Sequence, residues 1–361
     1  MRQAAIIGAG ALGLGFLAER LAGDYALHIA DTTPKAELLG RLKDEQGFTV
    51  NLCGRNGATP RRISVPITVS CTDTPEGRAA LDKALHEVDI VLTATGRRFL
   101  DVVVAVIRPA LNSRSRQVWL LFCENGMRVA ESQAPGFNNH VILADTVMSR
   151  MCRFGEPGDA GFAPLWPGSE SFLIVEEYGS FPLDAGQCGT RGSFSPAFTF
   201  LQSEEFAVWK DVKFYLHNGM HAFISYHAFL GGVTRFPEAP PGLRARTKDV
   251  MFSEVIPAIL ATHPSAHREE IEQYALSLLE RFFNPSFNDS TERGVRGTEE
   301  KLQPSERLLG GCEYIRRAGI EPRGYSSTIT AARKTLSRSG STTPSPKRGG
   351  SPSPQGYHFK S

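Results

Sequence analysis

The N-terminal residues place the strongest constraint on the fold. An apolar run, Ala4–Ile7, leads directly into a G-x-G-x-x-G motif formed by Gly8, Gly10 and Gly13. A helix is predicted from Gly13 to Leu21, so the glycines join a strand to a helix. In such a turn the first glycine permits the tight bend, the second leaves room for a pyrophosphate and the third lets helix and strand pack closely. Free N–H groups at the helix start favour an anion. The motif therefore predicts a dinucleotide-binding unit of the Rossmann type.

A carboxylate at the end of the second apolar run supports this interpretation. The run Leu27–Ala30 ends at Asp31, 18 residues after Gly13. A carboxylate at this position accepts hydrogen bonds from the adenosine ribose hydroxyls and repels a 2′-phosphate. We therefore expect NAD, rather than NADP, as the cofactor.

Other apolar runs indicate a sheet that is covered on both faces. They span residues 88–94, 118–122 and 141–144. Continuous apolar strands that alternate with helices are typical of a parallel sheet. Residues 48–69 are more polar and are predicted to form twisted hairpins inserted into this sheet. Residues 172–181 are predicted to form one more strand and a turn.

Helical periodicity dominates after about Ser195. Apolar residues there recur at three- and four-residue intervals, as in Ile271, Tyr274, Leu278 and Leu279. The predicted helices span residues 213–230, 248–261, 267–283 and 304–318. The predicted fold class is α/β, with an N-terminal Rossmann-type parallel sheet and a mainly α-helical C-terminal domain. The predicted boundaries are residues 1–192 for the dinucleotide-binding domain, 193–336 for the helical domain and 337–361 for a tail.

The predicted tail has its own composition. It is dense in Ser, Pro and Gly and almost free of apolar side chains. Such a segment buries too little surface to offset its chain entropy, so we expect it to be disordered and solvated. Its Ser-Pro steps and the pair Lys347-Arg348 leave open a phosphorylated or nucleic-acid-binding tail.

Composition argues against several other classes of protein. The chain has 40 Lys and Arg against 38 Asp and Glu, a net charge of +2, so we expect no nucleic-acid partner. No apolar stretch is long enough to span a membrane, and the N-terminus lacks a signal-peptide pattern, so we expect a cytoplasmic protein with no membrane partner. The six cysteines have neither CxxC nor zinc-finger spacing, so we expect buried free thiols, no disulfides and no metal site.

Three polar residues in one predicted helix are candidates for catalysis. Lys213, Asn218 and His221 are separated by five and then three positions. On a regular helix Asn218 and His221 share a side, whereas Lys213 lies about 140° from Asn218. A curved or broken helix could direct all three into one cleft. By periodicity alone this signal is weak, because a Lys, an Asn and a His on a helix are usually ordinary surface residues.

The spacing K-x-x-x-x-N-x-x-H resembles the active-site signature of the polyol-specific long-chain dehydrogenases, the mannitol dehydrogenase family. Other stretches agree with this family in order along the chain. They are the glycine motif, Asp31 and residues 93–96, 123–125, 145–150, 281–285, 292–296, 301–302 and 306–308. The similarity runs from residue 1 to about residue 335. It is closest to the short bacterial branch, which acts on mannitol 1-phosphate.

The resemblance implies metal-independent hydride transfer between D-mannitol 1-phosphate and D-fructose 6-phosphate, with NAD as cofactor. Lys213 would be the general acid–base, with a pKa lowered by burial or a nearby cation. Asn218 and Asn125 would donate hydrogen bonds to the oxygen that gains negative charge, and His221 would orient that oxygen. The implied cofactor-binding residues are Gly8, Gly10, Gly13, Asp31, Thr95 and Gly96.

The sequence also departs from the family pattern. Ser149 stands where the family usually has Asp before Arg150. The family usually has an acidic residue just before the catalytic lysine, and here only Asp211 could take that part. His217, between the signature residues, receives no role. These departures put the pH profile and turnover in question, but they leave the base and the amide donors in place.

The substrate class is less constrained. A phosphosugar requires cations, and guanidinium groups suit phosphate. Five cations lie close together in the sequence of the helical domain: Arg281, Arg293, Arg296, Lys301 and Arg307. A salt-bridged surface explains the same pattern equally well. Two alternatives stay open: a dehydrogenase for mannitol, fructuronate or altronate, and a catalytically weak NAD-binding protein. We expect a monomer or weak dimer whose partner is a small sugar phosphate or polyol.

Overall fold

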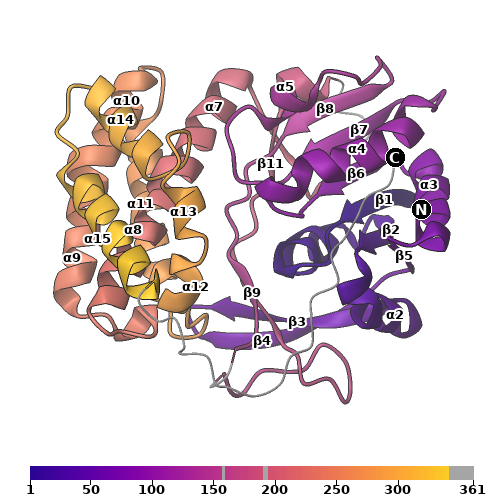
Figure 1. Cartoon of the computed structure of the whole chain (residues 1–361), viewed down its shortest axis with the longest axis horizontal. Helices are drawn as coiled ribbons and strands as arrows, with labels where there is room; N and C mark the ends of the chain where they lie inside the picture. Colours follow the sequence, from indigo (N-terminus) through magenta and orange to yellow (C-terminus); the bar gives the residue numbers. More distant parts are fainter. Residues whose placement is uncertain (157–158, 190–193, 341–361) are drawn as a thin grey trace.

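The computed structural model describes residues 1–156, 159–189 and 194–340. A half built on β-strands, the sheet half (described residues up to 201), lies beside a helical half (residues 203–340), as Figure 1 shows. The main sheet has six parallel strands in the order β5-β2-β1-β6-β7-β8. They are β1 (Arg2–Ile7), β2 (Tyr25–Asp31), β5 (Ile67–Cys71), β6 (Ile90–Thr93), β7 (Val118–Phe122) and β8 (Val141–Asp145). The strand order reverses between β1 and β6, where such sheets bind dinucleotides. The predicted Rossmann-type sheet is confirmed.

Both faces of this sheet are buried. Successive residues of β1 point to opposite faces: Ala4 and Ile6 join one apolar cluster, and Ala5 and Ile7 join another. The predicted first helix is present as η1 (Gly13–Ala18), a π-helical turn, and α1 (Glu19–Leu21). The other helical segments of this part are η2 (Thr33–Lys35), α2 (Ala36–Glu45), α3 (Pro75–Glu87), η3 (Arg97–Phe99), α4 (Leu100–Asn112) and α5 (Val129–Gln133). Burial on both faces explains why these strands are continuously apolar.

The polar hairpin was predicted within the main sheet, and that prediction is wrong. A second sheet holds it, in the order β4-β3-β10-β9. Its strands are β3 (Gly47–Gly54), β4 (Gly57–Ser64), β9 (Cys152–Phe154) and β10 (Leu173–Glu176). Only β5, which follows the hairpin, joins the main sheet. The hairpin stays more polar because β4 is almost entirely exposed, with Ile63 as its one buried residue.

This second sheet reaches the helical half, as the long β3 and β4 strands in Figure 1 show. The Cys53 thiol donates to the Ser286 carbonyl over 3.1 Å. Near the turn of the hairpin, Arg55 pairs with Glu280 at 2.6 Å. Asn284 donates its side-chain N–H to the Gly54 carbonyl over 3.2 Å. The hairpin therefore connects the two halves.

The predicted domain boundary, between residues 192 and 193, lies outside the described residues. On either side of it, β11 (Pro182–Asp184) and β12 (Thr199–Leu201) pair in parallel, with α6 (Ala185–Cys188) after the first of them. The helices of the second half begin at Ser203. The exact boundary remains a prediction.

The helical half encloses its own apolar core, which includes Met220, Phe223, Ile256, Leu278 and Tyr325. Its helices are α7 (Ser203–Asp211), η5 (Val212–His217), α8 (Asn218–Leu230), η6 (Phe236–Glu238), α9 (Pro241–Val250), η7 (Met251–Val255), α10 (Ile256–Thr262), α11 (Arg268–Phe282), α12 (Thr291–Val295), α13 (Thr298–Lys301), α14 (Leu309–Arg317) and α15 (Arg323–Gly340). The mainly helical second half is thus confirmed. No described helix has the length and apolarity that crossing a membrane requires.

Two further expectations differ from the structure in detail. The tail was predicted to begin at residue 337, but α15 continues to Gly340; the rest of the tail lies outside the described residues. All six cysteines are free, as expected. Four of them are buried, whereas Cys71 and Cys152 are partly exposed.

Candidate active site

The glycine motif borders a cavity of about 350 Å³ at the carboxyl ends of β1, β2 and β6. Gly8 has a φ of +119°, and a Cβ there would lie 2.5 Å from the Ala94 carbonyl oxygen. A Cβ on Gly13 would collide with the Gly8 carbonyl, so η1 packs tightly on the turn. A Cβ on Gly10, by contrast, would meet nothing within 4 Å. The open space at Gly10 fits a pyrophosphate that approaches the backbone closely.

Asp31 lines the same cavity. Its carboxylate accepts hydrogen bonds from the backbone N–H of Ala9 and of Thr32, both over 2.7 Å. These bonds hold the carboxylate at the glycine turn while leaving further lone pairs for ribose hydroxyls. Asp73 and Arg78 also line the cavity, and sequence reasoning missed both because they follow a different strand, β5.

Thr95 and Gly96 form the turn after β6. Thr95 lines the cofactor cavity, and its backbone N–H donates to the Glu124 carboxylate over 3.1 Å. Gly96 adopts a φ of +85°, which favours glycine, and does not line the cavity. Burial raises the pKa of Glu124, although hydrogen bonds from Thr93 and Thr95 oppose this effect.

A second cavity, of about 280 Å³, brings together all four predicted catalytic side chains: Asn125, Lys213, Asn218 and His221. Asn125 comes from the loop after β7, and the other three come from η5 and α8. Residues from both halves line the rest of the cavity. They are Leu12, Cys123, Met148, Arg150, Met151, Cys152, His217, Ala222, Arg293, Gly294, Lys301 and Arg307. The candidate active site therefore lies between the two halves.

A π-helical turn explains how Lys213 and Asn218 share this cavity. The segment η5 runs from Val212 to His217 and continues directly into α8. A π-helix closes its hydrogen bonds between residues i and i+5, so residues five apart return to the same side. The apparent offset of about 140° on a regular helix is thus removed by local geometry, and the three signature residues converge.

Lys213 lies in an environment that opposes its charge. Burial, with the Arg281 and Arg307 guanidinium groups nearby, holds the pKa of Lys213 well below its usual range. Glu176 is the nearby acid that acts in the opposite direction. The Asp211 carboxylate instead accepts from His263 Nε2 over 2.8 Å, so it does not take the lysine-tuning position suggested by the sequence. A lysine with a lowered pKa can exchange a proton near neutral pH.

The two asparagines contact each other. Asn218 Nδ2 donates to Asn125 Oδ1 over 3.1 Å. Asn218 is buried and Asn125 is exposed. The contact orients both amides and leaves the Asn125 amide nitrogen and the second N–H of Asn218 without another hydrogen bond to a described residue. These N–H groups can donate to an oxygen in the cavity.

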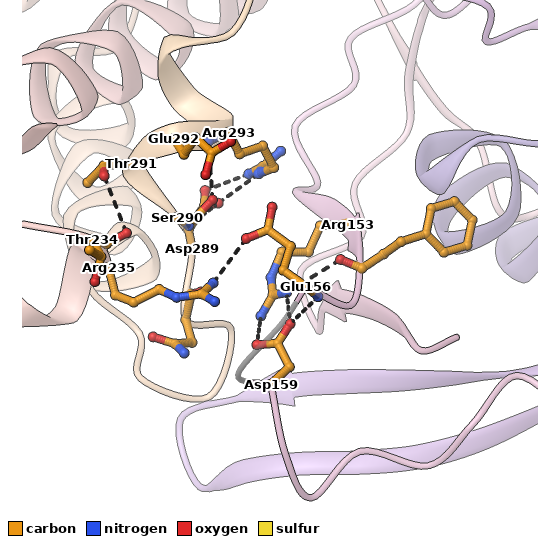
Figure 2. A network of polar contacts seen from close by, with 12 residues as sticks. Arg153, Glu156, Asp159, Thr234, Arg235, Asp289, Ser290, Thr291, Glu292 and Arg293 are labelled. Atoms are coloured by element: carbon orange, nitrogen blue, oxygen red, sulfur yellow. Dashed lines mark hydrogen bonds and ion pairs between the residues drawn. The ribbon is translucent and has the colours of Figure 1, made fainter. Parts of the chain in front are cut away.

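His221 is anchored by a carboxylate that sequence reasoning missed. Its Nε2 lies 2.8 Å from Asp289 Oδ2, and its Nδ1 lies 3.5 Å from Ser225 Oγ. Asp289 is fully buried and also accepts from Arg293, Nε at 2.7 Å and Nη2 at 2.5 Å. Figure 2 shows the Arg293 and Asp289 side chains meeting in this way. Asp289 lies 68 positions from His221, so no local spacing signals the pair.

Electrostatics around this pair keep His221 neutral. Burial lowers the pKa of His221, with Arg293 and Lys301 adding to the effect, although Asp289 opposes it. With Nε2–H donating to Asp289, Nδ1 is an acceptor. Since Ser225 Oγ donates to the His221 carbonyl over 2.6 Å, Nδ1 can accept a hydrogen bond from a ligand hydroxyl. His217 also lines the cavity, and its Nδ1 contacts Tyr274 Oη over 2.9 Å.

The loop after β9 extends the network around Asp289. Figure 2 shows Arg153 paired with Asp159, and Arg235 of the helical half paired with Glu156. The Arg235–Glu156 ion pair measures 3.2 Å and the Arg153–Asp159 pair 2.5 Å. The Arg235–Glu156 pair joins the two halves, whereas Arg153 and Asp159 both belong to the sheet half.

Three of the five cations suggested as phosphate ligands line the cavity: Arg293, Lys301 and Arg307. Arg281 does not, because its guanidinium forms a bidentate pair with Glu176 and also donates to the Ser149 carbonyl. Arg296 is also absent from the lining and pairs with Glu156 and Glu292 at the surface. Arg150, which sequence reasoning did not connect with phosphate, lines the cavity.

The cavity lining carries an excess of positive charge. It contains Arg150, Lys213, Arg293, Lys301 and Arg307, and the described residues that line it include no Asp or Glu. No group of three or more His, Cys, Asp or Glu side chains within the described chain could hold a metal ion. The site can therefore attract an anionic ligand and supply a base and amide donors beside it.

Comparison with known proteins shows what this chain is similar to. Residues 205–332 match the family described as Mannitol dehydrogenase C-terminal domain. A mannitol-1-phosphate 5-dehydrogenase of Shouchella clausii is 25% identical over 334 residues, which cover 91% of this chain and 87% of that protein. One from Paenarthrobacter aurescens is 24% identical over 347 residues, with 91% and 86% covered.

Solved structures show the same fold. The ternary complex of Pseudomonas fluorescens mannitol 2-dehydrogenase with NAD and D-mannitol aligns with a TM-score of 0.73 and 16% identity, covering 93% of this chain and 79% of that one. A D-sorbitol dehydrogenase in substrate-free form aligns with a TM-score of 0.66 and 14% identity, covering 92% and 80%. The two-part architecture is thus shared with both of these structures.

Proposed function

The chain is a member of the mannitol dehydrogenase family, and from this premise we propose that it interconverts D-mannitol 1-phosphate and D-fructose 6-phosphate by hydride transfer to or from NAD, with Lys213 as the general acid–base. The class of enzyme, an oxidoreductase acting on a CH–OH group, follows from the relatives. The substrate, the role of Lys213 and the preference for NAD are the proposed parts.

One observation carries the choice of a phosphorylated substrate. Besides Lys213, which must be neutral to act as the base, four basic side chains and no carboxylate line the cavity. A neutral polyol would require no such excess of positive charge, whereas a phosphate monoester carries nearly two negative charges at neutral pH. The relatives from Shouchella clausii and Paenarthrobacter aurescens, both named for mannitol 1-phosphate, support the same choice.

The residues of the glycine turn fit the cofactor. Gly10 leaves space for the pyrophosphate, and Asp31 offers its carboxylate to the adenosine ribose. Asp31 also repels a 2′-phosphate, which supports NAD over NADP. When bound, the nicotinamide supplies the acceptor or donor of the hydride.

The proposed catalytic side chains each have a different role in the reaction. In alcohol oxidation, neutral Lys213 accepts the hydroxyl proton from the substrate; in ketone reduction, its ammonium form returns that proton to the nascent alkoxide. The N–H groups of Asn218 and Asn125 donate to the oxygen while it is negatively charged. His221 accepts a hydrogen bond from a substrate hydroxyl at Nδ1 and holds the substrate in position.

NADH oxidation with fructose 6-phosphate, measured beside fructose, tests this function. We expect a kcat/KM at least about 100-fold higher for the phosphorylated ketose, since charge-assisted hydrogen bonds to phosphate are each worth about 1.5–3 kcal/mol. A preference for fructose would assign the chain to free polyols. NADH binding without turnover on any ketose or sugar acid would favour a binding protein.

A further inference from the structure

The cations of the active-site cavity differ in how many of their donors are already used. Two nitrogens of Arg150 already donate hydrogen bonds within the protein. Its Nε donates to the Glu176 carbonyl, and its Nη1 donates to the Gly15 carbonyl and to the Glu19 carboxylate. Arg293 directs its Nε and Nη2 at Asp289. Both guanidinium groups therefore serve mainly to hold the protein together at this cavity.

The two lysines are also committed. Lys301 Nζ donates to the carbonyls of Gly294 and Arg296, over 2.5 and 2.6 Å. One N–H of Lys301 remains for a ligand, because an ammonium has three donors. Lys213 is assigned to proton transfer, and its lowered pKa makes it a weak permanent charge.

Arg307 is different. It lies on the segment between α13 and α14, and its side chain is only 17% exposed. Its Nε is buried and has no hydrogen-bond partner within the described structure. Its contact with the neighbouring Glu306 carboxylate is long, at 3.5 Å. Arg307 lines the cavity, and its Nη1 forms no hydrogen bond to a described residue, so terminal N–H groups of this guanidinium are available to an anionic ligand.

We propose that Arg307 binds the phosphate group of the substrate, together with the remaining N–H of Lys301, and thereby determines the preference for phosphorylated over free polyols. A guanidinium presents two parallel N–H groups that match two phosphate oxygens. Binding would give the terminal N–H groups of Arg307 an anionic acceptor and would offset its charge. The inference rests on the proposed function, since it concerns the same cavity.

The surrounding charges agree with this assignment. Burial, with the Arg307 and Arg293 guanidinium groups close by, lowers the pKa of Lys301 to about 7. A phosphate dianion held by Arg307 favours the charged form of Lys301, so it raises that pKa and draws a proton onto the lysine. Ligand binding at pH 7.5 should therefore be accompanied by proton uptake.

The test compares Arg307→Gln with wild type on fructose 6-phosphate and on fructose. We expect kcat/KM for fructose 6-phosphate to fall about 10- to 150-fold, the equivalent of about 1.5–3 kcal/mol for a charged hydrogen bond. The kcat/KM of the variant for fructose should stay within about threefold of the wild-type value. Inorganic phosphate, a competitive inhibitor of the wild type on this model, should inhibit the variant at least tenfold more weakly. Arg316→Gln, an exposed change on α14, is the matched control. It should alter neither the kcat/KM values for the two ketoses nor the inhibition by phosphate.

A second variant keeps the test decisive. Arg307→Lys retains the positive charge but lacks the paired N–H groups of a guanidinium. We therefore expect a decrease in kcat/KM for fructose 6-phosphate that is intermediate between wild type and Arg307→Gln. If both variants fold and keep the wild-type ratio between the two ketoses, Arg307 is not the phosphate ligand, even though the enzyme still prefers the phosphorylated substrate. An equal loss on both ketoses would likewise overturn the inference. A wild type that prefers fructose would instead refute the proposed substrate itself.

Discussion

Asn218 and Asn125 meet across the two halves of the molecule, with Asn218 Nδ2 donating to Asn125 Oδ1 over 3.1 Å. One asparagine begins α8 of the helical half, and the other follows β7 of the main sheet. The pair of amide donors in the cavity therefore exists only while the two halves are in place against each other. In the proposed mechanism, stabilisation of the substrate oxygen therefore depends on the arrangement of the two halves.

The first prediction concerns this pair. Asn218→Ala should lower kcat for fructose 6-phosphate reduction by about 10²–10³-fold, because a donor to the developing alkoxide is lost. In Asn125→Ala the amide of Asn218 loses the contact that orients it. The factor by which kcat falls in the double variant should therefore be smaller than the product of the factors for the two single variants. Steady-state kinetics on all three variants measures this coupling. Asn56→Ala, an exposed change in the β3–β4 turn, is the control. Strictly multiplicative losses would contradict the coupling.

The second prediction concerns the base. Lys213→Ala should reduce turnover by about 10²–10⁴-fold, the usual contribution of general acid–base catalysis. NADH affinity, followed by fluorescence, should change little because the glycine turn and Asp31 lie in the other half. An added primary amine should restore part of the rate. Lys248→Ala, on the exposed side of α9, should behave as wild type. Near-normal turnover of Lys213→Ala would rule out the proposed base.

The third prediction is the pH dependence of polyol oxidation. The reaction requires neutral Lys213, so its rate should rise with pH as the lysine loses its proton. Because burial and the nearby arginines hold the pKa of Lys213 well below 10.5, the rise should be complete at a lower pH than the ordinary lysine pKa of about 10.4 would allow. Ketone reduction, which needs the ammonium form, should fall over the same interval. A rate of oxidation that still increases tenfold per unit at pH 10 would exclude this lysine.

The fourth prediction concerns cofactor choice. Asp31→Ser removes the charge that repels a 2′-phosphate, so kcat/KM for NADP should rise relative to NAD. Asp31 also accepts from the backbone N–H of Ala9 and Thr32, so the affinity for NAD should decrease as well. Asp44→Ser, an exposed change on α2, serves as the control. Comparable efficiency of the wild type with both cofactors would be the contrary result.

The fifth prediction concerns stability. Arg293 and His221 hold the pKa of Asp289 far below its usual range, although burial opposes them. A carboxyl whose folded pKa is depressed stabilises the fold above its unfolded pKa, about 3.9, and loses that contribution as pH falls. Asp289→Asn should therefore lower the free energy of unfolding by about 3–5 kcal/mol at pH 7, because Arg293 is left without its counter-charge.

Urea unfolding at pH 7 and at pH 3 measures this effect, because the contribution is lost only below the unfolded pKa of about 3.9. The difference between wild type and Asp289→Asn should be smaller at the lower pH. Glu292→Gln, which affects only the exposed pair with Arg296, should cost less than about 1 kcal/mol. A difference that does not depend on pH would show that Asp289 acts through shape rather than charge.

Local patterns were sufficient for the main sheet. The apolar strands and the glycine spacing depend on neighbouring residues, and Gly8, Gly10 and Gly13 lie where the motif predicts. The convergence of Lys213, Asn218 and His221 was visible only as a resemblance, because the π-helical turn that aligns the first two has no simple sequence signal. A regular helix was the natural assumption, and it separates them.

Contacts between residues far apart in the sequence could not be predicted from local patterns. Asp289 reaches His221 over 68 positions, and Arg281 meets Glu176 over 105, so neither pair has a periodic signature. Arg281 was therefore counted among the candidate phosphate ligands, although its guanidinium is already paired with the Glu176 carboxylate. The hairpin was assigned to the wrong sheet for a similar reason: its neighbour β10 arrives more than 100 residues later.

The hairpin contacts also bear on how the chain reaches its native state. Cys53, Arg55 and Gly54 find their partners Ser286, Glu280 and Asn284 only 225 to 233 positions later. During synthesis this early segment must wait for almost the whole of α11 before it can dock. Closing such a distance is entropically costly and slows folding. A chain cut before residue 280 should therefore leave the hairpin without its final support, and the two halves should not survive as separate pieces.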